Sequence, residues 1–156
     1  MAPGGFERGG ALDPELKTGV SGRRWLLGMI LVAASYVVIG VVFAALAKPA
    51  DANHVRMWRL AAWLASAALA AAHIGYEHYR LGGSPRTTAL HAAGAVALGA
   101  FGLALAANVH WLAAGSPGQR APLLALPIWP VVTAPPAFLG ALAAAALLAR
   151  VSRRRT

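Results

Sequence analysis

Four long apolar segments, separated by short polar loops, extend along the chain between Trp25 and Val151. The first three cover residues 25–47, 58–76 and 90–112. Each is close to the length of about 20 apolar residues that an α-helix needs to cross about 30 Å of hydrocarbon. The pattern therefore predicts an all-α integral membrane protein that folds as a four-helix transmembrane bundle.

The first segment ends in a stretch, residues 45–47, that looks like the cleavage site of a signal peptide. Its apolar run, residues 25–47, is longer than the roughly 7–15 residues that are typical of the apolar part of a signal peptide. It also contains no charged residue and is closed by Lys48. We therefore expect it to be retained as a transmembrane helix.

The fourth segment is rich in proline. Residues 122–136 contain five prolines: Pro122, Pro127, Pro130, Pro135 and Pro136. Proline suits the first turn of a helix and disrupts its interior. We therefore expect the regular helix to cover residues 130–150, with a kink at Pro135 and Pro136, and residues 113–129 to form an apolar loop on the outer surface.

An alternative for the same segment is a helix that begins at Pro122 and is broken around residues 127–136. Broken transmembrane helices often line transport sites. In size and number of spans the chain is similar to the small multidrug transporters, which carry an acidic residue in the first span. The first span here has none, which counts against a small transporter, although that reading stays open.

Composition agrees with a membrane protein. The chain is 58% hydrophobic and 12% charged, against about 25% charged residues in soluble domains. We expect a flexible N-terminal tail over residues 1–22, a membrane domain over residues 23–151 and a basic tail over residues 152–156. The absence of cysteine excludes disulfides and thiol chemistry.

Basic residues are distributed unevenly between the two ends of the predicted helices. Ten of the fourteen lie in the two tails and in the loop between the second and third spans, namely Arg8, Lys17, Arg23, Arg24, Arg80, Arg86, Arg150, Arg153, Arg154 and Arg155. Loops rich in Lys and Arg stay in the cytoplasm. We therefore expect an N-in/C-in protein, with both termini cytoplasmic, in a bacterial-type cytoplasmic (inner) membrane. The net charge of +9 then needs no nucleic-acid partner.

Few polar side chains fall inside the predicted spans, where each is costly and so a functional candidate. His73 and Glu77 lie four residues apart near the end of the second span, and His91 opens the third. The two histidines are expected at similar depth on adjacent helices. This arrangement suits a b-type haem ligated by His73 and His91, with Glu77 orienting an imidazole or exchanging a proton with it.

Other interpretations of these histidines are open. Both could lie near the interface and hydrogen-bond to each other, to Glu77 or to water. A proton relay, contact with a quinone and ligation of a pigment are further alternatives. On the third span, Gly94, Gly99 and Gly102 are interpreted as helix-packing sites, because small residues let helices approach closely in lipid.

Signatures of common enzymes are missing from the chain: it has no phosphate-binding glycine loop, no HExxH and no GxSxG. The function expected first is therefore a non-catalytic accessory or structural subunit that packs against lipid and against other membrane subunits or copies of itself. An electron-transfer membrane subunit, linked to haem or to a quinone through His73 and His91, is the alternative.

Overall fold

The chain folds into four long helices. The structure is a computed structural model that describes residues 14–48, 51–114 and 121–154. The helices are α1 (Pro14–Ala47), α2 (Ala52–Tyr76), α3 (Pro85–Ala113) and α4 (Ala121–Arg153). No strand occurs in these described ranges, and all four helices are long and apolar enough to cross a membrane. The prediction of an all-helical protein with four candidate transmembrane helices is confirmed.

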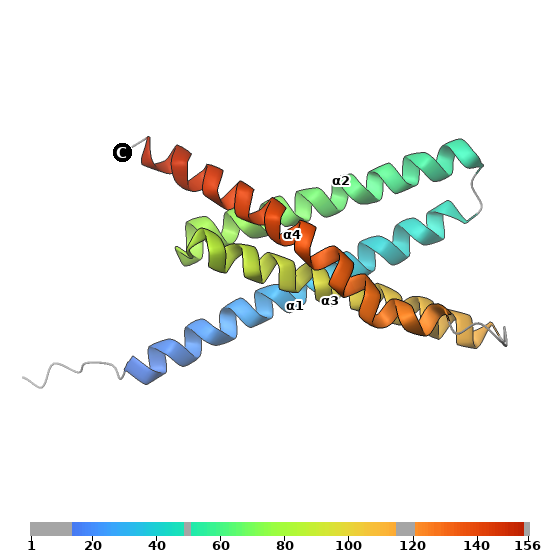
Figure 1. The fold of residues 1–156 in the computed structure, drawn as a ribbon, viewed down its shortest axis with the longest axis horizontal. Coiled ribbons are helices and arrows are strands. Elements are labelled where there is room, and N and C mark those ends of the chain that lie inside the picture. The colour runs from blue at the N-terminus through green and yellow to red at the C-terminus, as the bar shows by residue number, and fades with distance from the viewer. Residues whose placement is uncertain (1–13, 49–50, 115–120, 155–156) are drawn as a thin grey trace, which may run out of the picture.

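Successive helices run in opposite directions (Figure 1), so that the start of α1 and the end of α4 lie at the same end of the molecule. Helix α3 is central and packs most extensively on α4 and then on α1. It also carries most of the buried side chains, which are mainly alanine. Helix α2 packs mainly on α1 and touches α3 and α4 much less.

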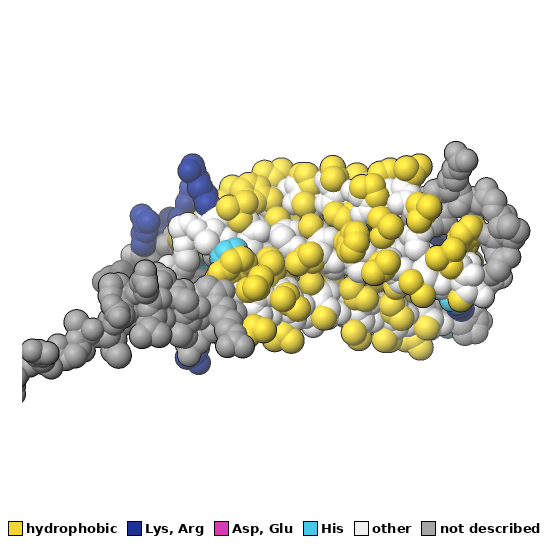
Figure 2. Space-filling model, turned by 90° about the horizontal axis from the view of Figure 1, so that it is seen from below, with side chains coloured by type: hydrophobic (Ala, Val, Ile, Leu, Met, Phe, Trp, Pro, Cys, Tyr) yellow, Lys and Arg dark blue, Asp and Glu magenta, His cyan; other side chains and the backbone are white. Residues whose placement is uncertain are grey.

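Large apolar side chains cover the outside of the bundle. On the face shown in Figure 2 they form a broad band, with Lys and Arg side chains beyond its ends. Exposed leucines, valines and aromatic residues occur on all four helices. A surface of this kind is unfavourable in water and suits hydrocarbon, where helices satisfy their own backbone hydrogen bonds. The protein is therefore a membrane-embedded, multi-pass protein.

Three glycines of α3 face α1: Gly94, Gly99 and Gly102. A Cβ atom at Gly99 would lie 2.8 Å from Cβ of Tyr36, and one at Gly102 would lie 2.6 Å from Cγ2 of Val37. Both distances are too short for carbon atoms in van der Waals contact. The glycines thus allow α1 and α3 to approach more closely than alanines would.

Helix α1 begins earlier than the sequence predicts. Residues 14–22 of the expected tail over residues 1–22 are helical, and residues 1–13 lie outside the described ranges; the flexibility of the tail stays a prediction. Proline is favourable at the first position of a helix, where its missing N–H has no partner to lose. A helix started at Pro14 then continues without interruption into the first apolar segment.

Helix α4 also begins early, at Ala121. The expected loop over residues 113–129 is wrong for residue 113, which belongs to α3, and for residues 121–129, which belong to α4. Residues 115–120 lie outside the described ranges. The alternative break around residues 127–136 does not occur, because α4 is a single helix. A proline removes one amide donor from a helix, but its φ angle is compatible with the helical conformation. In lipid the helix still satisfies the remaining backbone groups, so it continues through the prolines. The kink at Pro135 and Pro136 stays a prediction.

Helix α2 begins at Ala52, before the predicted residue 58, because Asp51 caps it. The Asp51 carboxylate accepts hydrogen bonds of 3.0 Å from the backbone N–H groups of both Asn53 and His54. The hydrogen bond from the backbone of His54, followed by that from its side chain, lowers the pKa of Asp51 from its ordinary value. This cap extends α2 by a polar turn outside the apolar segment.

Replacing Gly99 tests the close packing of α1 on α3. In Gly99→Ala the new methyl group would collide with Tyr36, and we expect the free energy of unfolding to fall by about 1–3 kcal/mol, as for other overpacked sites. The matched control is Gly28→Ala in α1, where a Cβ meets nothing within 4 Å. Unfolding in mixed detergent micelles, followed by circular dichroism, measures both. Equal stability of the two variants would contradict the packing.

Candidate functional site

A widened helical turn joins α2 to the start of α3. Residues Glu77–Leu81 form a π-helical turn, η1, which continues α2 and ends at Gly82, whose φ is +61°. Ser84 then caps α3, accepting a 3.2 Å hydrogen bond from the N–H of Thr87. Because the connection is only a few residues long, the end of α2 lies beside the first turns of α3. Turns of the π type are frequent at functional sites.

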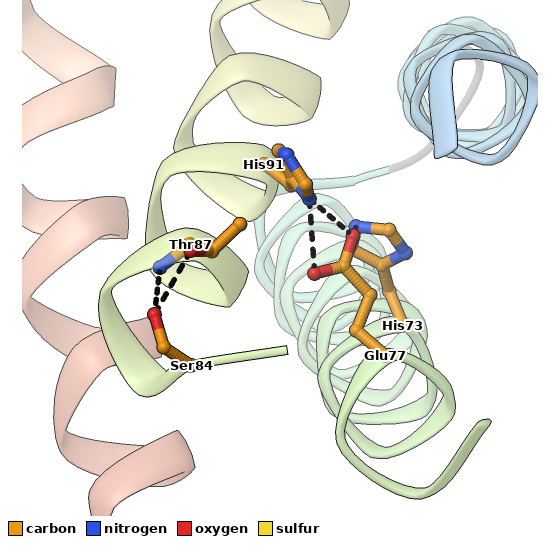
Figure 3. Close-up of polar contacts among 5 residues, drawn as sticks. All are labelled: His73, Glu77, Ser84, Thr87 and His91. Atoms are coloured by element: carbon orange, nitrogen blue, oxygen red, sulfur yellow. Dashed lines mark hydrogen bonds and ion pairs between the residues drawn. The ribbon is translucent and has the colours of Figure 1, made fainter. Parts of the chain in front are cut away.

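Glu77 lies between two histidines on neighbouring helices (Figure 3). Nδ1 of His91 lies 3.0 Å from Oε1 and 3.2 Å from Oε2 of the Glu77 carboxyl group. Nε2 of His73 lies 3.5 Å from Oε1, within range of an ion pair but without the geometry of a hydrogen bond. We call His73, Glu77 and His91 the carboxylate–histidine triad. The structure thus brings together all three residues that the sequence singled out.

Two members of the triad are shielded from the outside, and the third, His91, has a side chain that is 21% exposed. Glu77 is 3% exposed and His73 is 7% exposed. A carboxylate is a strong acceptor, and burial away from water makes each of its hydrogen bonds more important. The triad therefore forms a polar link between α2 and α3. The sequence raised hydrogen bonding of His91 to Glu77 as an alternative to haem, and this contact is the one observed.

An aromatic contact from α1 completes the environment of His91. The ring of Trp25 stacks on the His91 imidazole with centroids 4.6 Å apart and an interplanar angle of 5°. This contact was not predicted from the sequence. The one feature of the sequence that could have suggested it is the position of Trp25 at the start of the first apolar segment, where tryptophan is common as an interfacial anchor.

Helix α4 reaches the same end of the bundle through His78. Nε2 of His78 lies 3.4 Å from Oγ of Ser152, and that hydroxyl donates a 2.9 Å hydrogen bond to the carbonyl of Leu148. Adjacent residues of the π-helical turn therefore contact different helices, Glu77 facing α3 and His78 facing α4. Neither the π-helical turn nor this contact was predicted.

The two other histidines lie at the opposite end of the bundle. Nδ1 of His54 lies 2.9 Å from Oδ2 of Asp51, beside the cap of α2. Nε2 of His110 lies 3.5 Å from Nζ of Lys48, which links the ends of α3 and α1. Both histidines therefore lie far along the bundle from the triad, at the end where α1 finishes and α2 begins.

The observed directions of the imidazoles bear on the haem hypothesis. Haem ligation by His73 and His91 needs one nitrogen of each ring on opposite faces of a shared plane. In the structure one nitrogen of each ring is turned toward Glu77 instead. Within the described ranges, no group of three or more His, Cys, Asp or Glu side chains has a geometry that could hold a metal ion.

Comparison with known proteins found no matching family model, curated protein or solved structure.

A double-mutant cycle tests the contact between Glu77 and His91. Because Nδ1 of His91 approaches both carboxylate oxygens, we expect Glu77→Ala and His91→Ala to be coupled by about 1–3 kcal/mol in the free energy of unfolding, as residues in direct contact are. The matched cycle of Glu77→Ala with His73→Ala should show weaker coupling, because that pair lies 3.5 Å apart. Additive effects in the first cycle would show that the Glu77 carboxyl group of η1 and His91 of α3 do not interact.

Proposed function

We propose that this protein is a non-catalytic accessory or structural subunit of a larger membrane complex or of a homo-oligomer. The observation that carries the proposal is a face of α2 made of small residues. Its members follow one another at intervals of three or four positions and are partly or fully exposed: Ala61, Ala65, Ala68, Ala72 and Gly75. Faces of this kind let transmembrane helices pack closely on a neighbour.

The attachment of α2 within the bundle supports the same proposal. Helix α2 packs mainly on α1 and makes few contacts with α3 and α4. A Cβ atom at Gly75 would meet nothing within 4 Å, so this part of the face is open to a partner. A neighbouring transmembrane helix seated on α2 would bury the small residues and hold α2 in place.

We propose further that both termini face the cytoplasm of a bacterial-type cell. At the end of the bundle that holds the triad lie Arg80, Arg86, Arg150, Arg153 and Arg154, and at the other end lie Lys48, Arg56 and Arg59. The excess of positive charge at the first end favours its retention in the cytoplasm. The triad would then lie toward the cytoplasmic side of the membrane.

A bend of α4 at Pro135 and Pro136 is also proposed. Prolines at these positions have no N–H, so the carbonyl groups of Val131 and Val132 lose their usual helical donors. Sharp bends in helices occur mainly at such positions. A bend here would fall near the middle of the fourth span.

A b-type haem held by His73 and His91 is a second candidate, favoured by the approach of both imidazoles to one point on α2 and α3. It requires both rings to turn away from Glu77. A Soret band from the purified protein that disappears in His73→Ala and in His91→Ala would favour the haem. A colourless, folded protein would exclude it.

Leucine substitutions on the face of α2 test the subunit proposal. We expect native mass spectrometry of the protein released from membranes to show it with further membrane chains or copies of itself. In Ala68→Leu/Ala72→Leu the bulkier side chains should keep a partner helix away and reduce the assembled fraction about tenfold. The control, Ala143→Leu, changes an exposed alanine of α4 and should assemble normally. A wild-type protein that is monomeric under these conditions would contradict the proposal.

Labelling of introduced cysteines tests the orientation, since the chain has no cysteine of its own. A cysteine replacing Asn53, in the first turn of α2, should react with a membrane-impermeant maleimide added to whole cells. A cysteine replacing Gly83, between α2 and α3, should react only after the membrane is opened. The reverse pattern would place the triad on the outer side of the membrane.

A further inference from the structure

A cavity of about 710 Å³ lies among the four helices. Its lining is mainly apolar and comes mostly from α2 and α4, which contribute six alanines between them. One wall is formed by Ala92 and Val96 of α3, and His73 lies among the lining residues of α2. The volume falls within the range of about 300–1,000 Å³ that is typical of sites for small molecules.

The cavity is accessible from the hydrocarbon region. Trp63 and Val132 both line it and are 78% and 58% exposed on the outside of the bundle. Trp63 and His73 are ten residues apart on α2, which corresponds to about 15 Å along the helix axis. A molecule dissolved in the membrane could therefore enter sideways and extend along α2.

His73 supplies an imidazole to this mainly apolar cavity, whose other polar lining residues are Tyr36 and Thr133. The hydroxyl groups of Tyr36 and Thr133 already donate hydrogen bonds to the backbone carbonyls of Ser66 and Trp129. The side chain of His73 is 5% exposed, and its Nε2 has no hydrogen-bond partner among the described residues. Its second ring nitrogen points away from Glu77 (Figure 3). Because Nε2 faces Glu77, this second nitrogen, Nδ1, is the one that a ligand in the cavity would contact.

We propose that the cavity binds a membrane-soluble molecule of the quinone/quinol class, with its ring against His73 and its apolar tail along α2 toward Trp63. When Glu77 is ionised it can only accept, so the His73 nitrogen that faces it carries the hydrogen and the other is free to accept. A neutral imidazole thus accepts a hydrogen bond from a quinol hydroxyl. A protonated one donates to a quinone carbonyl. The same residue therefore suits both forms of the ligand.

The lining excludes a charged lipid as the specific occupant. None of the described residues that line the cavity is Lys, Arg, Asp or Glu, so a phosphate headgroup would be buried without a counter-charge, at a high cost. The ring of a quinone carries no charge, and its carbonyl or hydroxyl oxygens match the single imidazole. This site goes beyond the proposed subunit role, because an isolated monomer contains the whole cavity.

Two glycine substitutions test the site. Gly140 lines the cavity and Gly28 does not, and at both a Cβ would meet nothing within 4 Å. Leucine in place of Gly140 should therefore fill the cavity, and leucine in place of Gly28 should only add surface facing lipid. Calorimetric titration of decylubiquinone into the full-length protein in nanodiscs, with empty nanodiscs as the baseline, measures binding to both variants.

We expect saturable binding to wild-type protein and to Gly28→Leu with the same Kd, and binding at least tenfold weaker to Gly140→Leu. His73→Leu should also weaken binding about tenfold, and decylbenzene, which has no carbonyl group, should bind wild-type and His73→Leu proteins equally. Absence of saturable binding to the wild-type protein would overturn the proposal, as would equal binding of decylubiquinone to Gly140→Leu and Gly28→Leu. Binding unchanged in His73→Leu would overturn the role of the imidazole.

Discussion

The contact between the Glu77 carboxylate and His91 determines how the triad end of this molecule is arranged. A carboxyl group near the end of a transmembrane span is costly unless other groups satisfy it. The two 3.0–3.2 Å contacts from His91 meet this requirement from α3, and His73 approaches from α2 itself. The short connection between α2 and α3 allows this contact. The ring of Trp25, from α1, stacks on the His91 imidazole. Three helices thus meet around one carboxyl group.

Away from the triad, packing rather than polarity holds the helices. Hydrocarbon gives no hydrophobic drive for helices to associate, so close contact between small residues matters more than in water. Gly99 and Gly102 provide it between α1 and α3, and alanines provide it between α3 and α4. Helix α2 has fewer such contacts. The same deficit leaves the small-residue face of α2 exposed, and the mainly apolar cavity lies beside His73.

Much of this architecture was predictable, because the membrane imposes simple rules on sequence. The lengths of the apolar segments gave four helices, and the shared depth of His73 and His91 placed both near Glu77. Helix ends were predicted less well: Pro14 and Ala121 begin helices inside segments interpreted as a tail and a loop. In lipid, an unwound segment would leave its backbone N–H and C=O groups without partners. A helix in lipid therefore continues through prolines that would end it in water. The stacking of Trp25 and the π-helical turn depend on helix packing, which a sequence pattern does not encode.

Nuclear magnetic resonance of protein labelled with ¹⁵N-histidine, in lipid, tests the bridge between α2 and α3 most directly. Nitrogen shifts report which ring nitrogen carries a proton and whether it is hydrogen-bonded. We expect Nδ1 of His91 to be a hydrogen-bonded donor in the wild-type protein and its shift to change in Glu77→Ala, while the shift of His110, at the opposite end, does not. A His91 spectrum that is the same with and without the Glu77 carboxylate would show that the two side chains are not in contact.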